Sequence, residues 1–215
     1  ADAAPGGYRA AFAARGLDVV ADPDAAAGRV AGSAVRAALV TALDDWAILE
    51  KDPAVRDQVL ACVRRADPTS GANPFRDPVV WADLAALREA AARTDVARMA
   101  PGTIVAIADV LENAKARPAP LLRRGVAVHP RDFLLIFTLG QALDDGDPEK
   151  VGAYRAARAL RPDSFPVLIN LAHQFQERNL TDEAVTLLRD AVRVEPALAL
   201  GHSNLGASLR RRGDL

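Results

Sequence analysis

The side chains that most often perform catalysis or bind metal ions are few in this sequence and lie far apart. The three histidines, His129, His173 and His202, lack the i, i+4 spacing that places two zinc ligands on one helix face. Ser203 follows His202 directly, but no acidic residue is evident that would orient the imidazole as in a catalytic triad. We therefore predict no enzymatic activity, no metal site and no cofactor.

Cys62 is the only cysteine of the chain, so it cannot form an internal disulfide. Zinc and redox sites need a second cysteine or a histidine at ligand spacing, and the sequence offers neither. We expect the thiol to behave as a small buried hydrophobic group. A chain without disulfides fits a reducing compartment, and we predict a cytoplasmic protein.

Adjacent acidic residues occur twice, as Asp44-Asp45 and Asp144-Asp145. Neighbouring side chains on a helix point about 100° apart, because one turn holds 3.6 residues. Such a pair does not converge on a substrate as a general acid and base. We expect both pairs to lie on solvated helix faces.

Two short segments resemble nucleotide-binding motifs only superficially. Residues 28–32 (GRVAG) lack the Gly-x-Gly start of a phosphate loop, and the chain contains no Gly-Lys-Ser/Thr. Residues 129–133 (HPRDF) are similar to the catalytic loop of a protein kinase, but proline interrupts the motif and no asparagine follows at the required offset. We interpret the second segment as a turn between two repeats.

The composition favours helices that pack closely together. Of the 215 residues, 50% are hydrophobic and only 5% are aromatic, which suits helix pairs better than a β-sandwich. The net charge of −1 argues against a nucleic-acid partner. No apolar run approaches the roughly 20 residues that span a bilayer, so we predict no membrane partner.

An internal repeat of 34 residues is visible from Phe165 onward. Apolar residues recur at i, i+3, i+4 and i+7 in two successive segments, as on one face of a helix. A shift of 34 residues places Leu205 on Leu171 and Leu209 on Phe175. The two stripes consist of Leu168, Leu171, Ala172 and Phe175, and of Ala184, Leu187, Leu188, Ala191 and Val192, before Pro196.

This unit resembles the tetratricopeptide repeat family. The family pattern has large apolar residues at positions 7 and 11, small residues at 8, 20 and 27, and proline at 32. The small residues let two helices approach closely, and the large ones fill the groove of the neighbouring pair. The resemblance implies an all-α fold of antiparallel helix hairpins, stacked as a right-handed superhelix (an α–α solenoid). Here the six positions are Leu171, Phe175, Ala172, Ala184, Ala191 and Pro196.

Two shorter units precede this one. Leu139 follows Ile107 by 32 residues and precedes Leu171 by 32, so we expect two residues to be missing from each inter-helix turn. Lys150 stands where the family has a small residue. The predicted organisation is an N-terminal helical region with degenerate repeat-like hairpins at residues 1–100, followed by tetratricopeptide-type repeats at 101–215, the last of them truncated.

The N-terminal region has helical periodicity without a clear repeat. Asp22 and Asp52 are each followed by proline, which predicts helices that begin with aspartate as N-cap and proline at the first helical position. Residues 68–76 hold many turn-forming residues, and we predict a loop there.

The order of five segments resembles the region that follows the kinase domain in large bacterial serine/threonine protein kinases with tetratricopeptide arrays. The resemblance extends over essentially the whole chain and implies a regulatory or scaffolding arm of a longer protein, with a kinase domain before Ala1. The segments are residues 8–12 (YRAAF), 42–46 (ALDDW), 77–81 (DPVVW), 129–133 (HPRDF) and 159–164 (ALRPDS).

The resemblance to tetratricopeptide repeats also implies a tentative peptide-binding groove, because positions 5, 6, 9 and 12 of each first helix line the concave side in this family. Asn170 and Asn204 can donate and accept hydrogen bonds at once, which suits the backbone of an extended peptide. Arg210 suits an acidic group on that peptide. The implied residues are Ile169, Asn170, His173 and Gln176 in one unit, and Ser203, Asn204, Ala207 and Arg210 in the next.

The resulting prediction is a non-catalytic protein-protein interaction scaffold whose partner is a protein or an extended peptide. Two alternatives stay open: the substrate-presenting repeat region of a transferase such as a glycosyltransferase, and a structural spacer without a partner. The last helix would have no mate within the chain. We therefore also expect self-association through its exposed apolar strip.

Overall fold

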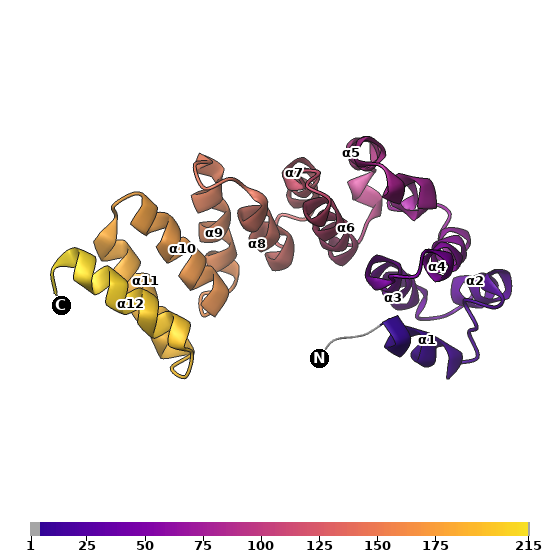
Figure 1. The fold of residues 1–215 in the computed structure, drawn as a ribbon, viewed down its shortest axis with the longest axis horizontal. Helices are drawn as coiled ribbons and strands as arrows, with labels where there is room; N and C mark the ends of the chain where they lie inside the picture. Colours follow the sequence, from indigo (N-terminus) through magenta and orange to yellow (C-terminus); the bar gives the residue numbers. More distant parts are fainter. Residues whose placement is uncertain (1–4, 215) are drawn as a thin grey trace. The chain divides into compact units, whose positions relative to one another are not determined.

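The computed structural model describes residues 5–214, and within this range the regular elements are α-helices and short 3-10 helices (Figure 1). The predicted all-α fold is confirmed. Two compact units divide the chain, unit 1 ending at His129 and unit 2 beginning at Pro130. Unit 1 holds α1 (Pro5–Ala13), α2 (Pro23–Ala31), α3 (Arg36–Leu49), α4 (Pro53–Ala66), η1 (Asn73–Arg76), η2 (Pro78–Ala82), α5 (Leu84–Arg93), η3 (Val96–Arg98), α6 (Pro101–Asn113) and α7 (Ala119–Val128). Unit 2 holds α8 (Phe133–Ala142), α9 (Pro148–Leu160), α10 (Phe165–Glu177), α11 (Thr181–Val194) and α12 (Ala199–Arg212).

The division into units follows packing, whereas the division predicted at residue 100 follows the repeat pattern. Helix α6 packs on α3, and α7 packs on α5 and η3, so these two helices belong to unit 1 by contact. Packing does not test where the repeat pattern begins, and the organisation into residues 1–100 and 101–215 stays a prediction.

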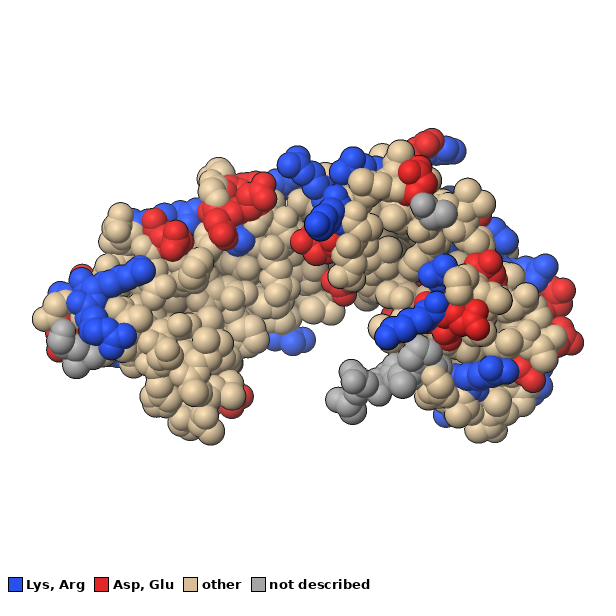
Figure 2. All heavy atoms as spheres, viewed as in Figure 1, with Lys and Arg blue, Asp and Glu red and all other residues tan. Residues whose placement is uncertain are grey.

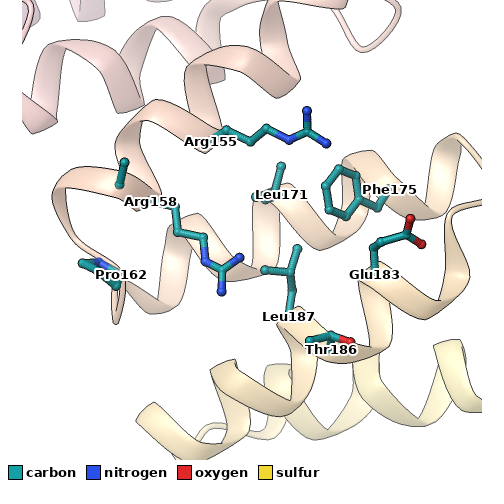
Figure 3. A pocket seen from close by; sticks show the side chains of 9 residues that line it. Arg155, Arg158, Pro162, Leu171, Phe175, Glu183, Thr186 and Leu187 are labelled. Carbon is teal, nitrogen blue, oxygen red and sulfur yellow. The ribbon is translucent and has the colours of Figure 1, made fainter.

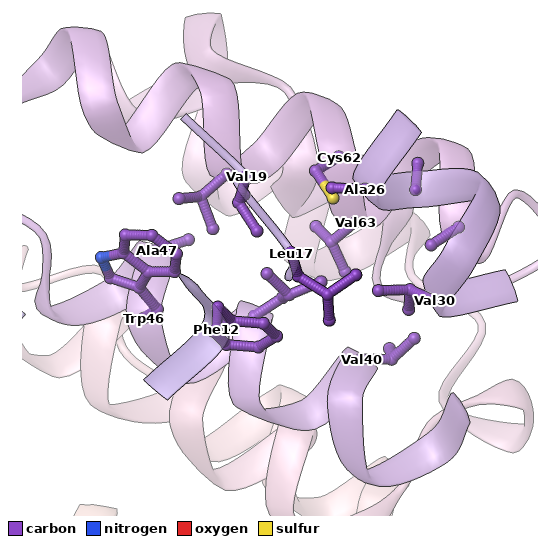
Figure 4. Packing of buried hydrophobic residues seen from close by; sticks show 14 of the residues in the cluster. Phe12, Leu17, Val19, Ala26, Val30, Val40, Trp46, Ala47, Cys62 and Val63 are labelled. Carbon is purple, nitrogen blue, oxygen red and sulfur yellow. The ribbon is translucent and has the colours of Figure 1, made fainter. Parts of the chain in front are cut away.

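Helices α2, α3 and α4 enclose the main hydrophobic core of unit 1 (Figure 4). Phe12 stacks on Trp46 with 5.8 Å between the ring centroids. Cys62 lies in the same core and is fully buried, as predicted. Burial raises the pKa of its thiol to about 11, so the group stays protonated and unreactive at neutral pH.

The two Asp-Pro pairs begin helices α2 and α4 as predicted. The carboxylate of Asp22 accepts a hydrogen bond from the backbone N–H of Ala25 at 3.0 Å, and that of Asp52 accepts from Ala54 at 2.9 Å. Each cap satisfies a backbone donor that the first helical turn leaves without a partner.

Asp44 is buried, which corrects the expectation of a solvated acidic pair. Its carboxylate accepts two hydrogen bonds from the guanidinium of Arg76, at 2.9 and 2.8 Å, and the two side chains are 6% and 2% exposed. Arg76 also donates to the backbone carbonyl of Asp67 and to the side-chain oxygen of Asn73. These bonds compensate for desolvation of the charges. They also explain why part of the predicted loop at residues 68–76 folds into the 3-10 helix η1.

Unit 2 consists of the helix hairpins α8–α9 and α10–α11, followed by α12 (Figure 1). The small residues expected at the helix contacts are fully buried, among them Ala172, Ala184 and Ala191. In the first hairpin a Cβ atom on Gly140 would lie 2.7 Å from Cε1 of Tyr154, so only glycine permits the observed approach of α8 and α9. Stacked hairpins with small residues at their contacts form an α–α solenoid.

The shorter spacing of the first hairpin in unit 2 arises in a helix, which corrects the expectation of shortened turns. Helix α8 has 10 residues, whereas α10 has 13. The connection between α8 and α9 covers residues 143–147, and the one between α10 and α11 covers only residues 178–180. The first helix is therefore shortened, and the turn that follows it is longer than its counterpart.

Lys150 is buried although the family pattern expects a small residue at its position. Its ammonium group donates to the backbone carbonyl of Leu143, the C-cap of α8, at 2.7 Å and to Asp145 at 2.8 Å. The hydrogen bond from Lys150 lowers the pKa of the Asp145 carboxyl. The aliphatic stem can thus fill the helix contact, because the charged end reaches acceptors at its rim.

Candidate peptide-binding face

Helices α10 and α12 lie next to each other in unit 2, and both are first helices of their repeats. Helix α10 buries one side in the core of the unit and exposes the other. On the exposed side, His173 and Glu177 lie one turn apart, with 3.8 Å between Nε2 and Oε1. Side chains from two repeats therefore share one surface.

The residues implied for the peptide-binding groove lie on these two helices but differ in exposure. Ile169 is only 9% exposed and packs in the core of unit 2 beside Tyr154, so it offers little surface to a partner. The remaining residues reach the surface to different degrees. Asn170, Gln176, Asn204 and Ala207 are half-buried, and His173, Ser203 and Arg210 are exposed.

Two of the half-buried amides are partly engaged inside the protein. The side-chain amide of Asn170 donates to the hydroxyl of Tyr154 at 3.4 Å. Burial raises the pKa of Tyr154 to about 12, so the phenol is neutral at physiological pH. Gln176 donates to the hydroxyl of Ser208, which is buried on α12, and so joins the two helices directly. In both amides the side-chain oxygen is left to accept a bond from a partner.

We call the five surface side chains Asn170, His173, Ser203, Asn204 and Arg210 the candidate peptide face. Together they carry amide, hydroxyl, imidazole and guanidinium groups, which can donate and accept hydrogen bonds and bind a carboxylate. This inventory suits recognition of a polar, extended ligand.

The exposed apolar residues at the start of α12 are Leu198 and Leu200. They lie in the region where the sequence predicts self-association. Nothing in the described residues covers or pairs this strip with a second copy of the chain, and self-association stays a prediction.

A cavity of about 670 Å³ lies between α9, α10 and α11 (Figure 3). Leu171, Phe175 and Leu187 form its apolar floor. The guanidinium of Arg155 lies over the ring of Phe175, 5.4 Å from its centroid. Arg158 reaches Asp190 on α11 at 3.2 Å.

Sequence reasoning did not single out this cavity, because it is lined by the second helices α9 and α11 and not by the first helices. The i, i+3 spacing of Arg155 and Arg158 was an available signal, since it places both side chains on one face of α9. What the spacing could not reveal is the apolar floor, which comes from residues of the next hairpin.

Other classes of site leave no trace in the part of the chain that the structure describes. Residues 5–214 contain no group of three His, Cys, Asp or Glu side chains arranged to hold a metal ion. None of the described helices is long and apolar enough to cross a membrane. On the face drawn in Figure 2, basic and acidic side chains are interspersed, without a continuous basic area.

The comparison with known proteins concerns the fold. No protein-family model matches the chain, and no curated protein is similar to it in sequence. The crystal structure of MamA protein is similar with a TM-score of 0.51 and 15% identity, covering 74% of this chain and 91% of that one. YrrB, described as a TPR protein with an unusual peptide-binding site, is similar with a TM-score of 0.52 and 15% identity, covering 75% of this chain and 89% of that one. The chain thus has a tetratricopeptide-like α–α solenoid fold.

Proposed function

We propose that this protein is a non-catalytic interaction scaffold that binds an extended peptide along the candidate peptide face. The observation that supports this most directly is the contact between α10 and α12 through Gln176 and Ser208, which brings the polar side chains of two repeats onto one surface. The fold that the chain shares with YrrB supports the same function.

The chemistry of the candidate peptide face suits a particular kind of peptide. An extended backbone presents a donor and an acceptor at every residue, and an asparagine amide can pair with both. Asn204 has no hydrogen-bond partner among the described residues, so its amide is available to a ligand. Arg210 lies further along α12 and would bind an acidic side chain of the same peptide.

The wider setting is proposed from the sequence resemblance. We infer that the chain is the repeat arm of a larger bacterial signalling protein with a serine/threonine kinase domain, and that it acts in the cytoplasm. A scaffold of this kind would bring a protein partner to the catalytic domain, without nucleic acid or membrane as a partner.

Peptide selection followed by affinity measurement tests the proposed function. Extended peptides would be selected on the full chain from a random displayed library, and their affinity measured by fluorescence anisotropy. We expect Asn204→Ala and Arg210→Ala each to weaken the selected peptides about tenfold, as expected for loss of a charge-assisted or backbone-directed hydrogen bond.

Arg189→Ala is the matched control, because Arg189 is exposed on the second helix α11 and away from the candidate peptide face. It should leave the affinity unchanged. Peptides that bind all four proteins equally would place the binding surface elsewhere. A failure to select any peptide would favour the structural spacer.

A further inference from the structure

A cavity of about 390 Å³ in unit 1 is unusually rich in hydrogen-bond donors. It forms where α3, the connection after α4, η3 and the start of α6 meet. Three arginines line it, Arg36, Arg76 and Arg98, whereas Asp67 is the one acidic residue of the lining. The charge of the lining therefore favours an anionic ligand.

The three arginines differ in how firmly they are held. Arg76 is fixed at the back of the cavity by its two bonds to Asp44. Arg36 bonds to Asp67 at 2.6 Å but is only half-buried. Arg98 is 68% exposed and pairs only with Asp95, at 3.3 Å and three residues away. Such an exposed pair is weak, so Arg98 can turn toward a ligand at little cost.

The N-terminus of α6 adds backbone donors at the same cavity. Its N-cap, Ala100, lines the cavity and has no side-chain oxygen to accept from the first helical turn. The N–H groups of this turn lack intrahelical partners, and the helix dipole places partial positive charge there. Both features favour an anion.

Thr103 gives a separate indication of a ligand. Its side chain lines the cavity and is 7% exposed, yet its hydroxyl has no hydrogen-bond partner among the described residues. Buried hydroxyls are normally paired, because an unpaired one loses its bond to water without compensation. An acceptor atom within the cavity would satisfy it.

Gly71 brings further hydroxyls to the cavity. A Cβ atom at this position would lie 2.0 Å from the backbone oxygen of Asp95, and the Gly71 N–H donates to the carbonyl of Arg98 at 3.4 Å. This close approach holds the segment with Thr69 and Ser70 beside Arg98, and both residues line the cavity.

We propose that this cavity binds the phosphate group of a phosphate monoester. A phosphate group carries nearly two negative charges and three acceptor oxygens, which match donors that come from several directions. Arg98 and Arg36 supply guanidinium donors, Ser70 and Thr103 supply hydroxyls, and α6 supplies backbone N–H groups. The cavity is many times larger than one water molecule, whose share of liquid volume is about 30 Å³, so it has room for the group that carries the phosphate. The site is independent of the candidate peptide face.

Isothermal titration calorimetry of the full chain tests the proposal, with inorganic phosphate, O-phosphoserine and serine as probes. We expect saturable binding of the two phosphate compounds and none of serine. Arg98→Gln should weaken binding about tenfold, because it removes a charged donor. Thr103→Val keeps the side-chain shape, removes the hydroxyl and should weaken binding severalfold.

Arg93→Gln is the matched control, since Arg93 is equally exposed, pairs with Glu89 four residues away and does not line the cavity. It should bind like the unaltered protein. Tighter binding of O-phosphoserine than of inorganic phosphate would identify a phosphorylated side chain as the ligand, and equal binding would identify free phosphate. No saturable binding, or equal binding by all variants, would overturn the proposal.

Discussion

The buried ion pair of Asp44 and Arg76 joins α3 to η1 through two hydrogen bonds. Removing one partner leaves the other charge buried without compensation, which typically costs about 3–5 kcal/mol. We expect Asp44→Ala to lower the free energy of unfolding by about that amount. Urea denaturation followed by tryptophan fluorescence measures it, since Trp46 lies on the same helix.

A double variant separates the charge from the packing. Asp44→Ala/Arg76→Met buries no charge and should be more stable than Asp44→Ala alone. Glu89→Ala, at an exposed position of unit 1, should change stability by less than about 0.5 kcal/mol. A loss at Asp44 as small as that at Glu89 would show that the pair is not buried.

At the scale of the element, the contact between α8 and α9 depends on one missing side chain. A Cβ atom on Gly140 would meet the buried ring of Tyr154 at 2.7 Å. We expect Gly140→Ala to lower the free energy of unfolding by about 1–3 kcal/mol, because overpacking outweighs the better helix propensity of alanine. Thermal denaturation followed by circular dichroism measures the change.

Gly152→Ala provides the opposite sign within the same hairpin. Gly152 lies inside α9, and a Cβ atom there would have no neighbour within 4 Å. The substitution should stabilise the protein by up to about 1 kcal/mol, through helix propensity alone. Stabilisation by both substitutions would rule out the close approach of α8 and α9.

At the scale of the whole molecule, a solenoid is stabilised by contacts between neighbouring repeats, so damage should stay local. Ala191 is fully buried between the helices of unit 2, whereas the core formed by α2, α3 and α4 contains only residues of unit 1. Ala191→Glu buries a charge and overpacks a helix contact. We expect faster amide hydrogen exchange in α10, α11 and α12, with unchanged exchange in α2, α3 and α4, as measured by mass spectrometry. Uniformly faster exchange would instead indicate one cooperative unit.

The sequence by itself determined the helical elements and much of their pairing. A period of 3.6 residues and a small residue at each close contact are local properties, so Leu171, Ala172 and Ala184 identified their hairpin without coordinates. Aspartate before proline marked the starts of α2 and α4 for the same reason. The resemblance to tetratricopeptide repeats placed the candidate peptide face on two helices that proved to be neighbours.

Only the tertiary structure decided how polar side chains are used. Periodicity shows which face of a helix is apolar, but it does not show which distant residue meets a given side chain. Asp44 and Arg76 are 32 residues apart, and the burial of Asp44 follows from that partner and not from its own surroundings in sequence. Ile169 is covered by its neighbours, and Gln176 is engaged by Ser208. The cavity between Arg36 and Thr103 exists because four separate segments converge, and convergence is a property of packing.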